Sequence, residues 1–233
     1  MLEDRLRRLE EKIQYCFRDQ TLLRQALTHS SFSNEQKINR YPDYERLEFL
    51  GDAVLELVSS DYMFHENPRM SEGELTKRRS SIVCEPALAF CARQIGLERF
   101  ILLGKGEEAT GGRKRDSIIS DVMEAVIGAV YLDSGIEEAR NFIRRFILSD
   151  LEHKQLFYDA KTILQEEVQK ENCGLLRYEL IREEGPEHDK NFVVEALIGD
   201  RKAGTGTGHS KKAAEQQAAY AALLKRKKDE TTF

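Results

Sequence analysis

Apolar residues up to about position 152 recur mostly at steps of three and four, the period of a buried α-helical face. No stretch in this part of the chain alternates with a period of two, so we predict an all-α N-terminal domain over residues 1–152. Asp19 and Ser71 stand where N-caps are expected, and Ser71 has Glu74 three positions on, as in a capping box. The expected helices are 1–13, 19–27, 43–67, one that begins at 71, 85–95, 120–135 and 136–151.

The pattern changes after a short predicted linker at residues 153–158. Residues 162–170 have helical spacing, 177–183 and 192–197 alternate as strands, and the glycine-rich stretch 201–208 predicts a third strand at the sheet edge. Ser210 then precedes an alanine-rich helix over 213–224. The order α-β-β-β-α predicts a small α+β domain over residues 159–228, with its helices on one face of an antiparallel sheet.

The most informative stretch is Glu45–Leu55, Glu-Arg-Leu-Glu-Phe-Leu-Gly-Asp-Ala-Val-Leu. Its acids share a helical stripe, on which Glu48 and Asp52 are four residues apart. A second apolar helix carries Asp121 and Glu124 at a spacing of three. If the two helices pack together, four carboxylates meet, and burying them unpaired would be costly. Hard cations such as Mg²⁺ prefer oxygen ligands, and four negative charges balance two such ions, as in displacement at phosphorus.

Other interpretations of these charges stay open. One acidic pair on a helix is usually a solvated face, and spacing alone does not decide between that and a metal site. Lys77, Arg78 and Arg79 form either a phosphate-facing patch or a solvated face. His29 closes a predicted helix, where a structural role is the commoner one. Residues 96–115, rich in glycine and charge, are expected to be a surface loop that contacts substrate.

Composition limits the class of protein. The chain has 233 residues, 40% hydrophobic and 33% charged, as in a soluble globular protein. No apolar run approaches the roughly 18 residues of a membrane span, and the charged N-terminus has no signal-peptide core. The four cysteines form no CxxC pair, so a reducing cytoplasm is expected. The net charge of −5 argues against nucleic acid, but it conceals local basic clusters at 211–212 and 225–228.

The C-terminal domain carries groups suited to duplex RNA. Residues 210–212, Ser-Lys-Lys, begin a helix, where free backbone N–H groups and the helix dipole favour phosphate. His188 lies in a predicted hairpin loop that could reach a minor groove. Gln165 and Glu166, on the first helix of this domain, could reach 2′-hydroxyls and base edges. The alternative is a small α/β domain whose last helix merely has a basic end.

These motifs resemble two known families. The stretch Glu45–Leu55 resembles the signature of the ribonuclease III endonuclease domain, and the second domain resembles a double-stranded RNA-binding domain. Together the resemblances cover nearly the whole chain. Supporting matches are Ala26–Ser30, Ser71–Thr76, Gly111–Arg113 and Asp121–Ala125 in the first domain, and Leu164–Glu166, Gly185–His188 and Ser210–Glu215 in the second.

The resemblance implies a Mg²⁺-dependent endoribonuclease, with Mn²⁺ able to substitute and no small-molecule cofactor. It implies that Glu48, Asp52, Asp121 and Glu124 hold the metal, with Asp52 and Glu124 as the catalytic pair. Glu45 and Glu74 match acids near the cleft whose roles are uncertain, and Phe49 matches a residue that inserts into the partner of a homodimer. The positions that match RNA contacts are Thr162, Gln165, Glu166, His188, Ser210, Lys211 and Lys212.

One position departs from the family. Asp43-Tyr44 precede the signature where the family often has His-Asn. The expected reaction is cleavage of double-stranded RNA to 5′-phosphate and 3′-hydroxyl ends, in ribosomal RNA precursors and other transcripts. A non-catalytic RNA-binding protein and a metal phosphohydrolase for small substrates are the alternatives.

Overall fold

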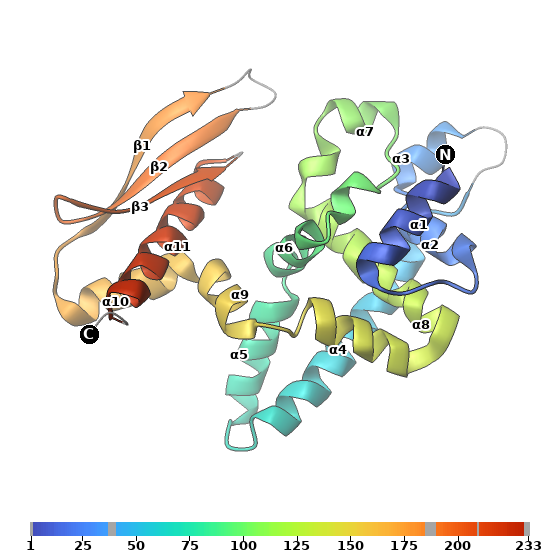
Figure 1. Ribbon diagram of the computed structural model, residues 1–233, viewed down its shortest axis with the longest axis horizontal. Coiled ribbons are helices and arrows are strands. Elements are labelled where there is room, and N and C mark those ends of the chain that lie inside the picture. The colour runs from blue at the N-terminus through green and yellow to red at the C-terminus, as the bar shows by residue number, and fades with distance from the viewer. Residues whose placement is uncertain (1, 37–40, 185–189, 209, 231–233) are drawn as a thin grey trace. The chain divides into compact units, whose positions relative to one another are not determined.

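The computed structural model describes residues 2–36, 41–184, 190–208 and 210–230. The chain forms two compact units, Met1–Leu151 and Glu152–Phe233, which are described separately below (Figure 1). None of the described helices has an apolar run long enough to cross a bilayer.

The first unit is helical, as predicted. Among its described residues the only strand-like pairing is one isolated bridge between Thr28 and Leu102. Its main core is a single cluster to which most of the helices contribute. The helices are α1 (Leu2–Ile13), α2 (Gln20–Ala26), α3 (Ser30–Glu35), α4 (Glu45–Glu66), α5 (Glu72–Val83), α6 (Glu85–Gln94), η1 (Leu97–Arg99), α7 (Lys105–Ala109), η2 (Gly112–Lys114) and α8 (Asp116–Phe146).

The predicted caps form the expected hydrogen bonds. The side chain of Asp19 accepts from the backbone N–H of Thr21 at the start of α2. Ser71 and Glu74 form a complete capping box at the start of α5, in which each side chain accepts from the other residue's backbone N–H. These local hydrogen bonds explain why both helices begin where the sequence indicates.

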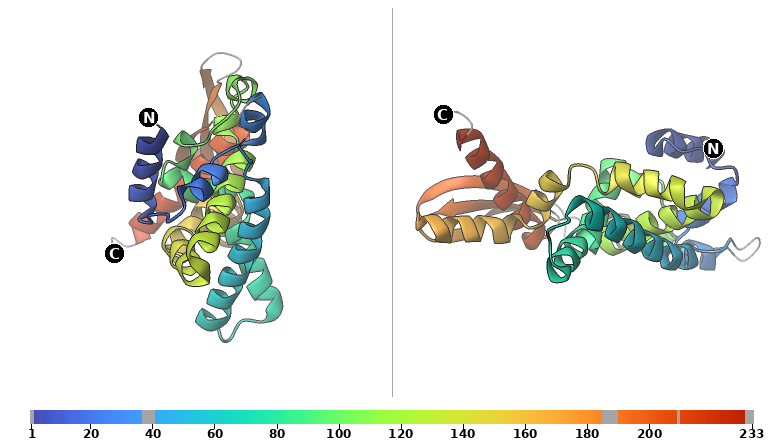
Figure 2. Two further views of the ribbon diagram at one scale, coloured as in Figure 1. Left: turned by 90° about the vertical axis from the view of Figure 1, so that its right-hand side faces the viewer. Right: turned by 90° about the horizontal axis from the view of Figure 1, so that it is seen from below.

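The longest helices, α4 and α8, lie side by side across the middle of the unit (Figures 1 and 2). Their backbones touch where each carries a glycine. A Cβ on Gly51 would lie 1.8 Å from the carbonyl oxygen of Glu124, and a Cβ on Gly128 would lie 2.3 Å from that of Leu47. Only glycine therefore permits this spacing, and the contact fixes the acidic stretch of one helix against that of the other.

Residues 96–115 differ from the expected surface loop. Their middle is core, because Ile101, Leu102 and Leu103 are all buried and Leu102 bridges to Thr28. Arg113, which lies in the segment expected to contact substrate, donates to the carbonyl oxygens of Glu98 (2.7 Å) and Ile101 (2.9 Å). The short helix α3 was also not predicted, because the polar residues 30–35 have no apolar period.

Helix α8 begins earlier than predicted, at Asp116, and is interrupted where the sequence indicates. Gly135 has φ 81° and ψ −174°, a conformation that side-chain-bearing residues rarely adopt. Next to this break, Asp133 accepts hydrogen bonds from the Tyr15 hydroxyl and from the backbone N–H groups of Arg18 and Asp19. The break is therefore fixed to the connection between α1 and α2.

The second unit has the predicted α-β-β-β-α order, preceded by one further helix. Its elements are α9 (Leu151–Tyr158), α10 (Ala160–Glu171), β1 (Leu176–Glu184), β2 (Asn191–Ile198), β3 (Arg201–Gly208) and α11 (Lys211–Glu230). The strands are antiparallel in the order β1-β2-β3, so β3 is an edge strand as expected. Helices α10 and α11 pack together, and α11 covers one face of the sheet (Figure 1).

The segment predicted to be a linker is helical in the structure. Residues 153–158 belong to α9, and Leu156 is 6% exposed within the core of the second unit. One buried leucine gives no readable period, which explains why the sequence indicated a linker.

The contact between α11 and β3 is rich in glycine and alanine. Gly204 and Gly206 face α11, where an added Cβ would lie 2.3 Å from the Ala218 carbonyl oxygen and 2.2 Å from the Ala214 carbonyl oxygen. Ala214, Ala218 and Ala222 on the helix are fully buried. Main chain therefore packs almost directly on main chain along this seam.

Candidate functional site

Four of the predicted acids lie on the two helices that meet at Gly51 and Gly128. Glu48 is half-buried and Asp52 exposed on α4, while Asp121 and Glu124 are half-buried on α8. An added Cβ on Gly51 would strike the carbonyl oxygen of Glu124. Gly51, which directly precedes Asp52, is therefore in backbone contact with Glu124. The backbone contact thus brings both acidic pairs to the same junction.

The acids affect one another's ionisation across this junction. Burial raises the pKa of Glu48 to about 7, with further contributions from the charges of Asp121, Glu45 and Asp52. Burial likewise raises the pKa of Glu124 to about 8, with the charges of Asp52, Glu48 and Asp121 adding to the effect. Because Asp121 raises the pKa of Glu48, and Asp52 and Glu48 raise the pKa of Glu124, the acids of the two helices interact electrostatically.

Asp121 has an additional partner. Burial raises its pKa, and the hydrogen bond from the Tyr44 hydroxyl, 3.3 Å from Oδ2, acts in the opposite direction. Tyr44 is 4% exposed and sits at the N-cap of α4. Sequence reasoning noted Tyr44 only as a departure from the family and did not place it in the site.

The donor set suits a divalent cation. Within residues 2–36, 41–184, 190–208 and 210–230, neither lysine nor arginine pairs with Glu48, Asp52, Asp121 or Glu124. Burial raises the pKa of Asp121 and outweighs the side chains of Tyr44 and Ser120 and the charge of His29, which lower it. Hard cations take such oxygen ligands. No group of three or more His, Cys, Asp or Glu side chains in the described residues already has the arrangement of a metal site. The fit therefore rests on charge and helix placement, and the ligand assignment stays a prediction.

Two further acids, Glu56 and Glu74, differ from the four of the cluster because each has a partner of its own. Glu56 extends the acidic stripe of α4 by one turn and its charge also raises the pKa of Glu124, but Arg79 pairs with it at 2.7 Å. The stripe's spacing could have revealed Glu56. Glu74 lies in the capping box, where hydrogen bonds from the Ser71 backbone N–H and hydroxyl lower its pKa. Arg79, whose role the sequence left open, also donates to the Ser60 hydroxyl at 2.7 Å.

The outer face of α4 is apolar and exposed. Phe49 is 81% exposed, Leu57 61% and Phe64 68%. Leu57 and Phe64 also line a groove between α4 and α5. Large apolar side chains repeated along one helix indicate a surface that another protein covers.

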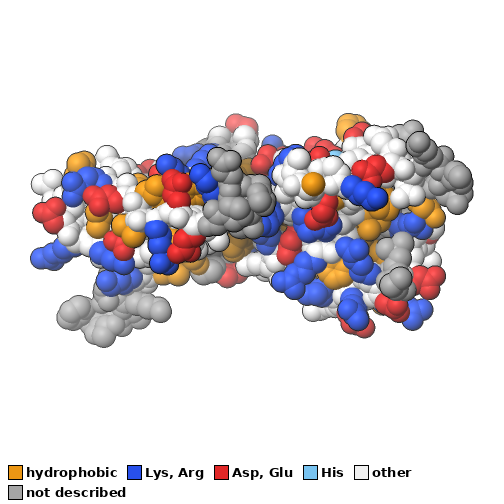
Figure 3. Space-filling model, turned by 90° about the horizontal axis from the view of Figure 1, so that it is seen from above, with side chains coloured by type: hydrophobic (Ala, Val, Ile, Leu, Met, Phe, Trp, Pro, Cys, Tyr) orange, Lys and Arg blue, Asp and Glu red, His pale blue; other side chains and the backbone are white. Residues whose placement is uncertain are grey.

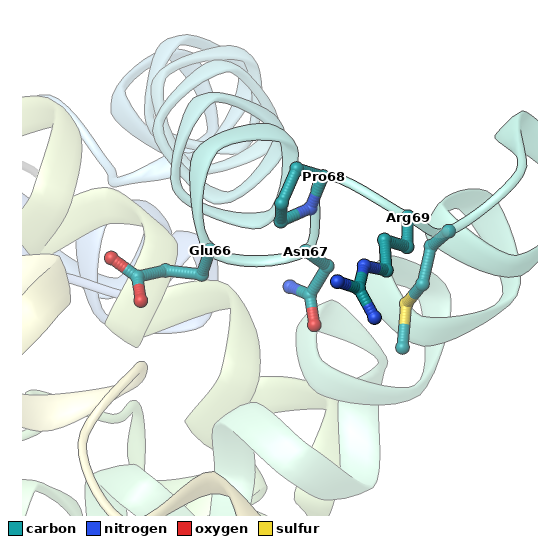
Figure 4. Close-up of a pocket in the computed structure, with 5 residues that line it drawn as sticks. Glu66, Asn67, Pro68 and Arg69 are labelled. Carbon is teal, nitrogen blue, oxygen red and sulfur yellow. The ribbon is translucent and has the colours of Figure 1, made fainter.

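A separate depression lies at the turn between α4 and α5 (Figure 4). It is lined by residues 66–70, and the Glu66 side chain extends away from Arg69. It lies about four helical turns from Asp52 and brings only one carboxylate to its lining, so it is not the site of the acids.

The second unit presents its predicted RNA contacts on two helices. Ser210 caps α11 by accepting from the backbone N–H of Ala213 at 3.1 Å. Lys211 and Lys212 are exposed in the first turn, and the ammonium of Lys211 lies 3.4 Å from Glu183. On α10, Thr162 and Glu166 are exposed and Gln165 is half-buried. His188 lies outside the described residues.

Charges of both signs cover this unit. Lysine and arginine alternate with acids over the visible face (Figure 3). Lys161 pairs with Glu215, Lys202 pairs with Glu195, and Arg226 pairs with Glu171. The overall negative charge therefore does not exclude anionic ligands at the first turn of α11.

Comparison with known proteins accounts for both units. Residues 19–151 match the family described as Ribonuclease-III-like, and residues 160–226 match the double-stranded RNA binding motif. Ribonuclease 3 of Caldanaerobacter subterraneus subsp. tengcongensis is 51% identical over 220 residues, which cover 93% of this chain and 96% of the relative. The chain belongs to the ribonuclease III family.

Two further comparisons support membership of this family. Ribonuclease 3 of Shouchella clausii is 51% identical over 210 residues, covering 89% of this chain and 81% of the relative. A structure of the nuclease domain of ribonuclease III from Campylobacter jejuni shares 44% identity at a TM-score of 0.56, covering 60% of this chain and 94% of that one. As a ribonuclease III-family member, the chain is a double-strand-specific endoribonuclease, which removes the two alternative functions.

Proposed function

We propose that this enzyme hydrolyses duplex RNA with Mg²⁺, which Mn²⁺ can replace, and leaves 5′-phosphate and 3′-hydroxyl ends. Glu48, Asp52, Asp121 and Glu124 hold two ions, and Asp52 and Glu124 are the catalytic pair. The proposal rests on one observation, the mutual rise in pKa of Glu48 on α4 and Glu124 on α8, in a cluster that pairs with neither lysine nor arginine among the described residues. Such a cluster binds divalent cations in exchange for its protons.

Bound at this junction, two divalent ions would lower the pKa of an attacking water and stabilise the leaving 3′ oxygen. The protein's own contribution is to position the carboxylates. Asp52 and Glu124 come from different helices, so their separation depends on the contact at Gly51. Glu124 is half-buried, so its surroundings are less polar than water and its attraction for cations is stronger.

Double-stranded RNA is the partner that the second domain is proposed to grip. The proposed contacts are Thr162, Gln165, Glu166, His188, Ser210, Lys211 and Lys212. Support comes from the exposure of Ser210, Lys211 and Lys212 at the start of α11 and of Thr162 and Glu166 on α10, where Gln165 is half-buried. Backbone and 2′-hydroxyl contacts of this kind recognise duplex shape more than sequence.

A homodimer is proposed to place two such sites on one duplex, one for each strand. The exposed stripe of Phe49, Leu57 and Phe64 on α4 supports it, because each ring or aliphatic group would be buried by a second copy. The expected result is a dimer in sedimentation equilibrium, which Phe49→Glu dissociates. If the protein without this substitution is a monomer, the proposal is wrong.

Ribosomal RNA precursors are the proposed cellular substrates, together with other transcripts. A reducing cytoplasm is the proposed compartment, supported by four cysteines, none of which forms a disulfide bond in the structure. Comparing precursor lengths in cells with and without the gene tests the substrate assignment.

The central test is Glu124→Gln, which removes the charge but nearly keeps the shape. We expect Mg²⁺-dependent cleavage of a long RNA duplex to fall by at least about 10²-fold, while duplex binding in EDTA is unchanged. Glu138→Gln is the matched control, since Glu138 is an exposed acid on the same helix. Unimpaired cleavage by Glu124→Gln would remove Glu124 from the catalytic pair.

A further inference from the structure

Tyr44 connects three parts of the first unit at the junction of the acids. Its backbone N–H donates to the Thr28 carbonyl oxygen at 2.9 Å, and its ring centroid lies 5.7 Å from that of His29. Its own carbonyl oxygen accepts from the N–H groups of Leu47 (2.8 Å) and Glu48 (2.9 Å), the first turn of α4. The tyrosine is thus immobilised by its backbone and its ring.

The Tyr44 hydroxyl extends from α4 to the other acidic helix. It donates to Oδ2 of Asp121 at 3.3 Å, while the side chain as a whole is 4% exposed. A tyrosine hydroxyl is protonated at neutral pH, so it acts as a donor to this carboxylate. Asp121 also has a hydrogen bond with the Ser120 side chain; the Tyr44 hydroxyl contacts Oδ2 and not Oδ1.

We propose that Tyr44 is a positioning residue of the metal site, whose hydroxyl fixes the rotamer of Asp121 and leaves Oδ1 for the cation. The inference rests on the proposed function, in which Asp121 is a ligand. Hydrogen bonds to ligating carboxylates orient them, and their loss typically weakens metal binding by about 10- to 100-fold. Tyrosine performs this role at a position where the family often has asparagine, whose side chain is shorter.

The test is Tyr44→Phe, which keeps the buried ring and removes only the hydroxyl. Mn²⁺ binding to the RNA-free protein, followed by electron paramagnetic resonance, should weaken by about 10-fold. The Mg²⁺ concentration for half-maximal cleavage should rise by a similar factor, and cleavage should recover at saturating Mg²⁺.

Tyr15→Phe is the matched control. The Tyr15 hydroxyl is also partly buried and donates to an aspartate of α8, Asp133, at 2.5 Å. Asp133 lies about 18 Å along the helix from Asp121. Tyr15→Phe should lower the melting temperature without changing Mn²⁺ affinity or the Mg²⁺ midpoint.

Three results would overturn the inference in distinguishable ways. If Tyr44→Phe behaves like Tyr15→Phe, with lower stability and unchanged metal dependence, the hydroxyl serves packing alone. If Tyr44→Phe lowers the maximal rate without moving the Mg²⁺ midpoint, it does not act through a metal ligand. If the unchanged protein neither binds Mn²⁺ nor requires Mg²⁺, the proposed metal site fails together with this inference.

Discussion

The contact of α4 with α8 can be tested by adding a single methyl group. In Gly51→Ala the new Cβ would lie 1.8 Å from the Glu124 carbonyl oxygen, 2.6 Å from its carbonyl carbon and 2.9 Å from the Gly128 nitrogen. All three are main-chain atoms, which cannot rotate aside as a side chain can. The two helices must therefore separate or tilt to accept the methyl.

The size of the effect follows from that geometry. An ordinary contact begins at 3.4 Å, so the oxygen at 1.8 Å is about 1.6 Å too close. Overpacking of this kind costs about 1–3 kcal/mol, which in a unit of this size lowers the melting temperature by about 2–12 °C. A displacement above 1 Å between Asp52 and Glu124 should also slow cleavage by about 10²-fold.

The measurement uses the full chain. Thermal unfolding is followed by circular dichroism, and cleavage is measured on a long RNA duplex in Mg²⁺. Gly73→Ala is the control, since Gly73 lies in α5 with no atom within 4 Å of an added Cβ. It should cleave normally and gain up to about 1 kcal/mol. Should Gly51→Ala melt and cleave like the unchanged chain, main-chain contact would not be what positions the acids.

Three further predictions concern charge. The pKa values of Glu48 and Glu124 are raised to about 7 and 8. Between pH 4.5 and 8 the unfolded chain therefore binds fewer protons than the folded one, and metal-free stability should fall as pH rises. The increase in melting temperature on adding Mg²⁺ should accordingly be larger at pH 8 than at pH 6, and an equal increase would contradict this. Arg113→Lys should cost about 1–3 kcal/mol in urea unfolding, because one ammonium cannot satisfy the carbonyl oxygens that the guanidinium reaches; an unchanged midpoint would refute it. Lys211→Ala should weaken binding to all RNA duplexes alike and reduce the salt slope by about one, and loss confined to one sequence would argue against a phosphate contact.

The sequence predicted the features that depend on local period and capping. Helical stripes predicted the all-α first unit and placed Glu48 and Asp52 on one helix. Alternation predicted the first two strands, and the glycine-rich stretch 201–208 the third. The capping box at Ser71 and the caps at Asp19 and Ser210 form because their hydrogen bonds join residues only two or three apart. For the same reason the break at Gly135 could be predicted from one residue.

Long-range contacts were beyond the sequence. The bridge from Thr28 to Leu102 turns part of a charged, glycine-rich stretch into core, and no local pattern signals it. Tyr44 and Asp121 meet only because α4 and α8 are in contact. The Tyr44 hydroxyl contacts a residue of another helix, and no pattern at helical spacing indicates such a contact. The sequence therefore showed Tyr44 only as an unusual residue before the stretch Glu45–Leu55.

The seam of glycine and alanine between β3 and α11 has a consequence for duplex selection. Few rotamers are frozen there, so little side-chain entropy is lost on folding. Because main chain packs on main chain, the distance between α11 and the sheet is fixed. The first turn of α11 therefore cannot shift to fit a groove of different shape. The second unit should therefore bind A-form duplexes in preference to others. B-form DNA should compete poorly with duplex RNA for this unit, although its phosphates carry the same charge.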